Sequence, residues 1–377
     1  MSKAADLANL IGNINAGGGG VNRNVIINGA MNVAQRGTSS TGIGASTGYF
    51  TCDRWLFSRE AGTEQARFTM TQDTASVGID SLPFQEAGIR TALKMDVTTA
   101  ESAVAAGEAS YIVQRIEGFN CSNLDIKTKP ITLSFYAKSD TKTGTMCASL
   151  YASSGGRHHV KEYSITTDWQ RFSLTFPADS SATALANDSS NELQVNFALT
   201  AGSNLQVTGD QWASGFDIAT SNQINFADST DNNWYITGVQ LEVGQNATEF
   251  EREPFAQTEI KCFRYTQRLP HRDNTSGTGF ANITTMGRND SSTGNSSSVT
   301  LPVVMRADST ITTSGSFRIH HNATATDATG LAIDDNIGTS GSVNIFTTVA
   351  SGLTQGHGGQ LQQKDDVDAH VICSAEL

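Results

Sequence analysis

The 377-residue sequence has little of what marks a disulfide-stabilised or membrane-spanning protein. Its five cysteines are odd in number and form no C-x-x-C pair, which argues against a disulfide framework and a zinc knuckle. No stretch approaches about eighteen consecutive apolar residues, and the amino terminus lacks the apolar core of a signal peptide, so we expect cytoplasmic synthesis without membrane insertion. The cysteines are expected to be small buried side chains: Cys52, Cys121, Cys147, Cys262 and Cys373.

Basic residues are also scarce. The chain has 25 Lys and Arg against 37 Asp and Glu, a formal net charge of −12. Proteins that bind a phosphate backbone do so through clustered Lys and Arg, so we expect no nucleic-acid partner. No block of like charges is present, and we interpret the acidity as a solubility feature of a large surface.

Proline is rare, with 6 residues, whereas glycine reaches 35 and Ser, Thr and Asn are abundant. A hydrophobic content of 38% is enough for real cores over two or three domains. This composition is typical of short strands joined by many turns. We therefore expect a mainly β protein.

Residues 24–253 read as short strands without intervening helices. Alternation is clearest in I-T-L-S-F-Y-A from Ile131 and in E-L-Q-V-N-F-A-L from Glu192, where every second residue is apolar. Strands in this order predict a two-sheet β-sandwich. The predicted strands are Phe68–Gln72, Ala92–Val97, Tyr111–Ile116, Ile131–Lys138, Met146–Tyr151, Lys161–Ile165, Gln170–Phe176, Leu193–Leu199 and Trp234–Val243.

A connecting helix is predicted over residues 254–270. Pro254 suits a first helical turn, and Pro270 disfavours helical dihedrals at the residue before it. Between them Phe255, Ile260 and Phe263 recur at three- to five-residue spacing, as on one face of a helix.

The interval 271–377 repeats the strand pattern and predicts a second, smaller β-sandwich. Strands are expected at Ala281–Met286, Ser298–Met305, Ser316–His320, Val343–Thr348 and Ala369–Ala375. The segments Asn289–Ser298 and Ala323–Gly330 have turn chemistry and little to bury. We expect them to be adaptable loops.

The first 23 residues predict a short amphipathic helix followed by a flexible linker. Apolar residues fall on one helical face, among them Leu7, Leu10, Ile11 and Ile14. A lone helix this short is marginal in water and needs a partner. Gly17–Gly20 lacks the Lys-Ser/Thr and the strand and helix of a phosphate-binding loop.

No pattern identifies catalytic residues, a metal site or a cofactor. Gly44–Gly48 matches G-x-S-x-G, but in a Ser/Thr/Gly loop rather than at a strand-to-helix turn. His158-His159 and His320-His321 would point to opposite faces of a strand, and we expect both pairs to be exposed. Asp228, Asp231 and Asn232 lack the full spacing of a calcium loop and read as turn residues.

Sugar binding needs exposed aromatic rings beside amide and carboxylate groups. Tyr151, next to S-S-G-G-R-H-H, and Trp212, in G-D-Q-W-A-S-G-F, both flank turn-like stretches. They are the candidate ligand-binding residues. Trp169 and Trp234 sit within alternating strands, where core packing is expected.

Three segments resemble tail-fibre and other appendage proteins of tailed bacteriophages. Near the amino end are N-x-x-I-N-G-A-M-x-V-A-Q-R-G, from Asn24 to Gly37, and D-R-W at Asp53–Trp55. The third runs through Q-L-E-x-G and A-T-x-F-E to E-I-x-x-C-x-R-Y, from Gln240 to Tyr265. L-P-V-V-M-R at Leu301–Arg306 and the terminal A-E-L are also similar.

The resemblance implies a jelly roll of the carbohydrate-binding-module type, with the aromatic of D-R-W packed onto it. It also implies a virion appendage, a tail fibre, anchored to tail or capsid proteins by its amino-terminal helix. A homotrimer joined by residues 255–269 and recognition of a host-surface glycan or protein, with residues 277–377 outermost, are expected. The alternatives are a head fibre or capsid decoration protein, and a small glycan hydrolase.

Overall fold

The computed structural model describes residues 23–60, 65–121, 124–271, 280–335 and 341–377. Two compact units divide the chain between Thr258 and Glu259, with Leu377 assigned to the first unit. The predicted anchor residues Leu7, Leu10, Ile11 and Ile14, and the glycine linker after them, lie outside the described residues.

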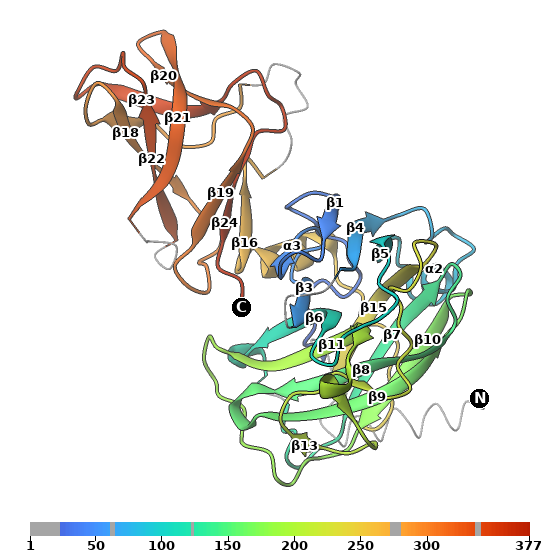
Figure 1. The fold of residues 1–377 in the computed structure, drawn as a ribbon. Coiled ribbons are helices and arrows are strands. Elements are labelled where there is room, and N and C mark those ends of the chain that lie inside the picture. The colour runs from blue at the N-terminus through green and yellow to red at the C-terminus, as the bar shows by residue number, and fades with distance from the viewer. Residues whose placement is uncertain (1–22, 61–64, 122–123, 272–279, 336–340) are drawn as a thin grey trace. The chain divides into compact units, whose positions relative to one another are not determined.

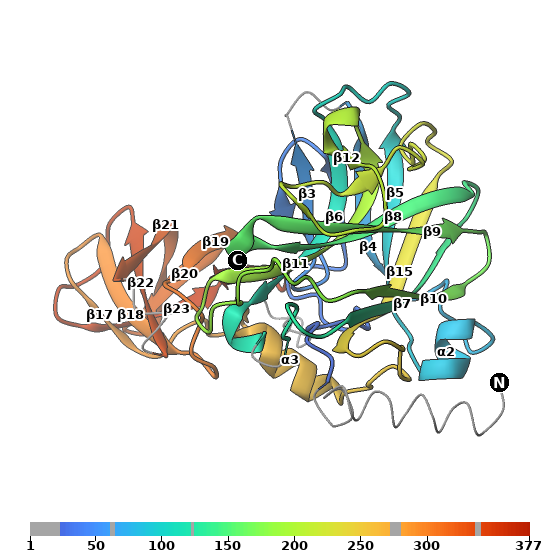
Figure 2. The ribbon, with the colours of Figure 1, turned by 90° about the horizontal axis from the view of Figure 1, so that it is seen from below.

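The first unit is the predicted β-sandwich, built from two antiparallel sheets (Figures 1 and 2). Every strand expected between Phe68 and Val243 is present. One sheet has the order β1 (Ser39–Ile43), β4 (Arg67–Asp73), β5 (Ala92–Thr99), β15 (Asn233–Val243), β7 (Ile131–Ser139), β10 (Gln170–Phe176). The other has the order β13 (Ala213–Ser214), β9 (Arg157–Ile165), β8 (Gly144–Ala152), β11 (Asn191–Ala201), β6 (Ala109–Glu117), β3 (Leu56–Glu60), β2 (Gly48–Tyr49).

Short elements complete this unit. The parallel pair β12 (Gln206–Val207) and β14 (Ala219–Thr220) lies in the connection between β11 and β15. The helix α2 (Leu82–Ala87) joins β4 to β5, and the 3-10 turns are Gly118–Asn120, Ser153–Gly155 and Ser203–Leu205.

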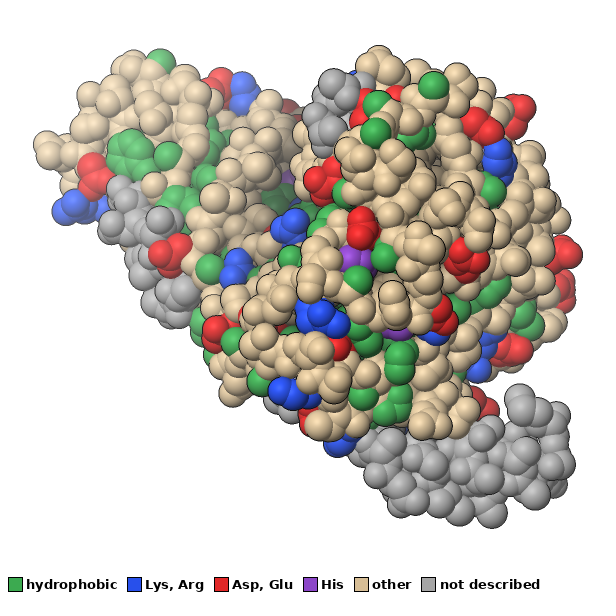
Figure 3. All heavy atoms as spheres, turned by 60° about the horizontal axis from the view of Figure 1, so that its bottom comes forward, with side chains coloured by type: hydrophobic (Ala, Val, Ile, Leu, Met, Phe, Trp, Pro, Cys, Tyr) green, Lys and Arg blue, Asp and Glu red, His purple; other side chains and the backbone are tan. Residues whose placement is uncertain are grey.

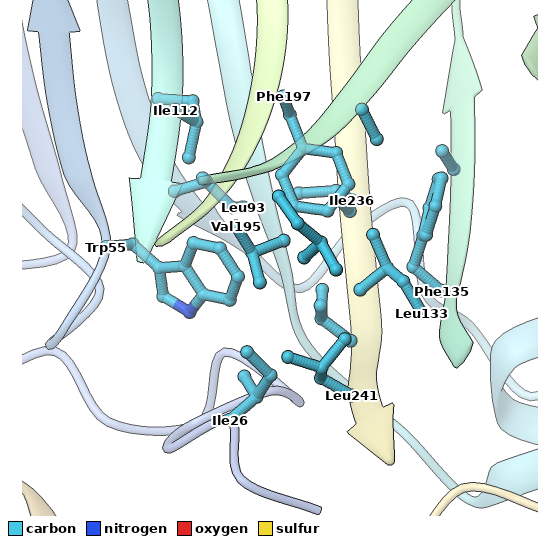
Figure 4. Packing of buried hydrophobic residues seen from close by; sticks show 14 of the residues in the cluster. Ile26, Trp55, Leu93, Ile112, Leu133, Phe135, Val195, Phe197, Ile236 and Leu241 are labelled. Carbon is cyan, nitrogen blue, oxygen red and sulfur yellow. The ribbon is translucent and has the colours of Figure 1, made fainter. Parts of the chain in front are cut away.

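The sandwich core consists of the inward residues of the two sheets (Figure 4). The Phe135 and Phe197 rings, one from each sheet, meet edge to face at 5.0 Å, and Trp55 lies 6.2 Å from Phe197. All three side chains are 0% exposed. Burial of each such side chain contributes about 1.5–3 kcal/mol, so the core accounts for the alternation seen in the sequence.

The amino-terminal motif is a structural feature of the sandwich. The Asn28 side-chain amide donates to the carbonyls of Val33 at 2.9 Å and Asp53 at 3.0 Å. The indole Nε1 of Trp55 donates to the Asn28 carbonyl at 3.1 Å. These bonds hold the D-R-W segment against the first residues of the unit, so the expected packing of its aromatic onto the sandwich is confirmed.

A second motif forms a hydrogen-bonded clasp, in which Gln240 and Glu242 are fully buried. Its members are Asn24, Gln240, Glu242, Thr248 and Glu251. The Glu242 carboxylate accepts from the backbone N–H of Thr248 at 2.9 Å and from the Gln240 amide at 2.8 Å. The side-chain oxygen of Gln240 accepts from the backbone N–H of Glu251 at 2.7 Å, and the Glu251 carboxylate accepts from the backbone N–H of Asn24 at 3.0 Å. The clasp ties the chain after β15 back onto that strand and onto the first described residues.

The connecting helix is shorter than predicted. The helix α3 covers Phe255–Phe263, and residues Thr266–Leu269 form the strand β16, paired with β24 (His370–Ser374). Pairing with a partner about one hundred residues away overrode the local periodicity that predicted a helix to Pro270. On α3, Phe255 is 46% and Ile260 55% exposed, whereas Phe263 is 8% exposed.

The second unit contains a closed barrel where we expected a smaller sandwich. A three-stranded sheet has the order β16, β24, β19 (Thr310–Ser314). The barrel runs β17 (Gly287–Asn289), β18 (Gly294–Thr300), β22 (Ser342–Val349), β21 (Thr324–Asp335), β20 (Phe317–His321), β23 (Gly358–Gln363). Its core is a separate apolar cluster that includes Phe317, Ile319 and Ile345.

The two predicted loops of this unit are wrong. Asn289–Ser298 holds the end of β17 and most of β18, and Ala323–Gly330 falls largely in β21. Ser and Thr fit a barrel wall because their side chains are small, and Ser297 and Thr347 are buried in it. Ala281–Met286 forms no strand, only the isolated bridge of Asn282 with Gln362.

Two further predictions concern the distribution of surface charge and the lack of a membrane-spanning segment. On the face shown in Figure 3, acidic and basic side chains are interspersed, in keeping with acidity spread over the surface. Among the described residues, no helix has the length and apolar character needed to cross a membrane.

Substitution of Gly29 tests how closely the amino-terminal segment approaches β15 beside the clasp. A Cβ on Gly29 would lie 2.2 Å from the carbonyl oxygen of Val239 on β15, so we expect Gly29→Ala to lower the free energy of unfolding by about 1–3 kcal/mol. Urea unfolding followed by tryptophan fluorescence measures this, because Trp55, Trp169, Trp212 and Trp234 all lie in the first unit.

Gly78→Ala is the matched control, since nothing lies within 4 Å of its Cβ position. It should change stability by less than about 0.5 kcal/mol. Equal effects of the two substitutions would contradict a close approach of the amino-terminal segment to β15.

Candidate functional site

Residues 208–217 cross the edge of the seven-stranded sheet, and we call this segment the strap. Its middle forms β13, in which Ala213 pairs with His158 and Ser214 with Arg157 of β9. The Arg157 guanidinium also donates to the Ser214 hydroxyl at 3.3 Å. The strap therefore adds a short edge strand and places its side chains on both sides of β9.

On the side facing away from the core, Phe216 of the strap packs against an apolar cluster that includes Tyr111 and Val160. Phe216 meets Tyr151 edge to face at 5.0 Å and lies 6.2 Å from Tyr111. In the strand register, Asn196 lies between these tyrosines. Its Nδ2 donates to Ser149 at 3.1 Å, but its buried Oδ1 has no hydrogen-bond partner among the described residues.

On the core-facing side, Trp212 packs at the sheet edge beside a hollow. Its Nε1 donates to the carbonyl of Pro177 at 2.7 Å, and its ring meets His159 edge to face at 5.2 Å. The hollow measures about 410 Å³ and is open to solvent. It is lined by Pro130, Lys161, Thr175, Pro177, Asp210 and Gln245.

Asp210 links the strap to β9 by charge. Lys161 Nζ donates to Asp210 Oδ2 at 2.6 Å, and His159 Nε2 lies 2.5 Å from Asp210 Oδ1, a hydrogen bond in which Nε2 carries the proton. Burial tends to raise the pKa of Asp210, but these two hydrogen bonds hold it below its ordinary value. Burial lowers the pKa of His159 despite the nearby carboxylate.

The two candidate ligand residues lie on different faces of the seven-stranded sheet. Trp212 belongs to the strap, and Tyr151 contacts Phe216 of the strap. Tyr151 pairs with His158 and shares its face, whereas Trp212 contacts His159, the next residue along β9. Adjacent strand residues point to opposite faces. Tyr151 and Trp212 therefore do not form a single platform.

Sequence reasoning missed the strap and misjudged both histidine pairs, since His321 is 7% exposed and His320 is half-buried. His158 and His159 are both 0% exposed, so the expected exposure of this pair is wrong. Their faces are covered because the strap passes over both sides of the edge strand. The signal was present in G-D-Q-W-A-S-G-F-D, where two aromatic residues flank a short strand and two aspartates face the histidines.

Other candidates are structural. Asp228 Oδ1 accepts from the Asn232 amide at 2.9 Å and Oδ2 pairs with Lys142, so these loop oxygens serve the turn. The described residues hold no cluster of three His, Cys, Asp or Glu side chains suited to a metal. Gly44–Gly48 links β1 to β2 without a following helix. All five cysteines are buried, as predicted.

No protein-family model matches the chain, and no curated protein does. Several solved structures are distantly similar to it. Family 11 carbohydrate-binding module from Clostridium thermocellum, solved with a β-1,3-1,4-mixed-linked tetrasaccharide, is 11% identical with a TM-score of 0.29, over 56% of this chain and 98% of that one. TmCBM61, solved with β-1,4-galactotriose, is 11% identical with a TM-score of 0.28, over 59% and 99%.

The enzymatically active domain of tailspike protein 4 from bacteriophage CBA120 is 13% identical, with a TM-score of 0.29. The match covers 59% of this chain but 21% of that chain. At TM-scores below 0.5 we carry over neither ligand nor activity from these proteins.

His159 gives the site a testable pH dependence. Because its folded-state pKa lies below the ordinary value of 6.5, the unfolded chain takes up the proton first as the pH falls, and stability falls with it. The charged and titratable groups around it are Asp210, Lys161 and His158. Asp210 keeps its charge in this range because its pKa is lowered.

We expect the urea midpoint of the wild type to fall more between pH 7.5 and pH 5.5 than that of His159→Gln. Tryptophan fluorescence follows the transition. A wild type that becomes more stable on acidification would mean that the pair with Asp210 outweighs burial, contrary to this account.

Proposed function

We propose that the chain is a structural component of a tailed-phage particle, a tail fibre, that binds a glycan on the host surface through its first unit. In this proposal the protein is made in the host cytoplasm and acts on the virion. The observation that carries the binding part is the hollow beside the strap, where a lysine, a carboxylate and an amide meet at an open sheet edge. Trp212 lies next to it and donates a hydrogen bond to Pro177 of its lining.

The phage part rests on what the motif residues do. Asn24, Asn28, Gln240, Glu242, Thr248 and Glu251 make the clasp and its neighbouring contacts. Asn28, Gln240 and Glu242 are buried, and a buried polar group must be hydrogen-bonded. The resemblance to phage appendage proteins is therefore a resemblance in the residues that the fold requires, and this favours a shared architecture over chance similarity.

The hollow has the chemistry for a sugar. Gln245 is exposed and its side chain is available for hydrogen bonding, while Lys161 and Asp210 offer a donor and an acceptor at the rim. Trp212 is half-buried, with its Nε1 already satisfied, so the exposed part of its ring is left for apolar contact. A sugar ring suits such a surface, because it has an aliphatic C–H face and hydroxyl groups at its edge. The patch under Phe216 is less suitable because that ring covers it.

Gln245→Ala is the sharpest test of the hollow, because it removes one lining amide without touching the strap. We expect it to weaken binding of host-surface polysaccharide about 5- to 10-fold, the loss of about one net hydrogen bond. Isothermal titration calorimetry on the full chain measures this. Trp212→Ala should abolish detectable binding.

Two controls accompany this test. Gln170→Ala changes an exposed glutamine at the far end of β10 from Thr175, and should bind as the wild type does. Tyr151→Ala alters β8 on the opposite face of the sheet and should also retain binding. Loss of binding in Tyr151→Ala with retention in Gln245→Ala would move the site to the patch under Phe216.

A homotrimer is part of the proposal, supported by the exposed apolar side chains of α3. Phe255 and Ile260 are 46% and 55% exposed, and three helices around one axis would bury them. Light scattering on purified protein should give the molar mass of three chains. Changing both residues to Ser should give monomers, whereas a wild type that is monomeric at micromolar concentration would contradict the proposal.

Two alternatives share parts of this evidence. A head fibre or capsid decoration protein would use the same units, and a density map of the intact particle showing the chain on the head would favour it. A small glycan hydrolase would release reducing ends from the bound polysaccharide. Release of reducing ends that is lost in Asp210→Asn would favour the enzyme.

A further inference from the structure

A second cavity of about 500 Å³ lies in the first unit, at the carboxyl end of α2. It is separate from the hollow beside the strap and shares no lining residue with it. Its walls combine apolar side chains of Ile26, Ile89 and Phe250 with polar ones of Asn32, Arg90 and Arg252. The cavity thus offers apolar contact and hydrogen-bond donors together.

The two arginines are the unusual feature of this cavity. The Arg90 guanidinium stacks 4.1 Å from the centre of the Phe84 ring, and Arg252 lies against Gly88, where a Cβ would be 3.0 Å from its Nη1. Both side chains are exposed. Neither pairs with a carboxylate among the described residues, whereas Arg23, Arg36 and Arg157 do.

The carboxylates that line the cavity are already engaged. Glu251 accepts a hydrogen bond from the backbone N–H of Asn24 at 3.0 Å, and Glu253 accepts one from the Thr258 hydroxyl at 3.3 Å. Asn32 accepts from the Thr91 hydroxyl at 2.7 Å through Oδ1, which leaves its Nδ2 as a donor. The donors that the cavity offers a ligand are therefore this amide and the two guanidinium groups.

The two exposed guanidinium groups favour an anion in the part of the cavity that they line, although Glu251 and Glu253 also line it. Guanidinium binds planar carboxylates and phosphates through paired hydrogen bonds, and these charge-assisted bonds are stronger than neutral ones. The apolar walls at Ile26, Ile89 and Phe250 suit a ligand larger than a free ion. A sugar ring that carries an anionic group has both properties.

We propose that this cavity is a second glycan subsite, which holds the anionic group of an acidic saccharide between Arg90 and Arg252. The proposal rests on the proposed glycan-binding function and deepens it, because it names the charge class of the sugar. The hollow beside Trp212 would then bind neutral parts of the same polysaccharide.

The test compares two oligosaccharides of equal length, a tetramer of glucuronic acid and a tetramer of glucose, by calorimetry on the full chain. We expect the acidic tetramer to bind more tightly, and Arg252→Gln or Arg90→Gln to weaken it about tenfold or more, as the loss of a hydrogen bond to a charged group implies. Binding should weaken as salt is raised.

Lys127→Gln is the matched control, because it removes one exposed positive charge that does not line the cavity. It should leave the affinity for the acidic tetramer unchanged. Arg252→Lys, which keeps the charge but not the paired donors, should fall between the wild type and Arg252→Gln. The urea midpoint of each variant separates a binding role from support of α2.

The outcomes distinguish this proposal from the function it rests on. Equal binding of both tetramers, unaffected by the arginine substitutions, overturns the acidic subsite and leaves glycan binding standing. Binding of neither tetramer nor of host polysaccharide overturns both. Arginine-dependent binding of inorganic phosphate without the acidic tetramer overturns the saccharide assignment, and so does an Arg252→Gln effect confined to stability.

Discussion

The buried carboxylate of Glu242 constrains the first unit more than any other group. It sits on the central strand β15 at 0% exposure, where a charge is costly unless it is compensated. Thr248 and Gln240 supply hydrogen bonds, and Arg23 Nε lies 3.6 Å away. To make these contacts the chain must turn back after Gly244. The same turn brings the start of the unit beside β15, which explains why the two most distant motifs of this unit occur together.

The strap completes one edge of the seven-stranded sheet. Asp210 and the β13 pairing fix the strap to β9. The hollow beside it is lined by residues from β9, β10 and the strap, together with Gln245 next to the clasp. The geometry of the hollow therefore depends on both the strap and the clasp. Loss of the clasp's hydrogen bonds should distort the hollow as well.

Sequence reasoning succeeded where one rule was enough. Every second residue of Ile131–Ala137 and Leu193–Leu199 faces the core, and alternation predicts this directly. It failed at Thr324–Asp335, whose Thr-rich composition reads as a turn although its neighbours in sequence, β20 and β22, pair with it. It also failed at Thr266–Leu269, where a strand forms because the distant β24 pairs with it. No local pattern reports such a partner. Tyr151 and Trp212 were identified by their turn-like neighbours, but their opposite faces and the burial of His158 and His159 depend on the strap, which is a tertiary feature.

The central claim is that the first unit binds the host glycan beside the strap. Hydrogen–deuterium exchange of the intact protein, with and without purified host-surface polysaccharide, tests it most directly. Polysaccharide should slow exchange in residues 157–165 and 208–217, because the bound ligand would hold the strap against β9. Polysaccharide that binds yet slows exchange only within residues 280–376 would contradict the account and assign recognition to the second unit.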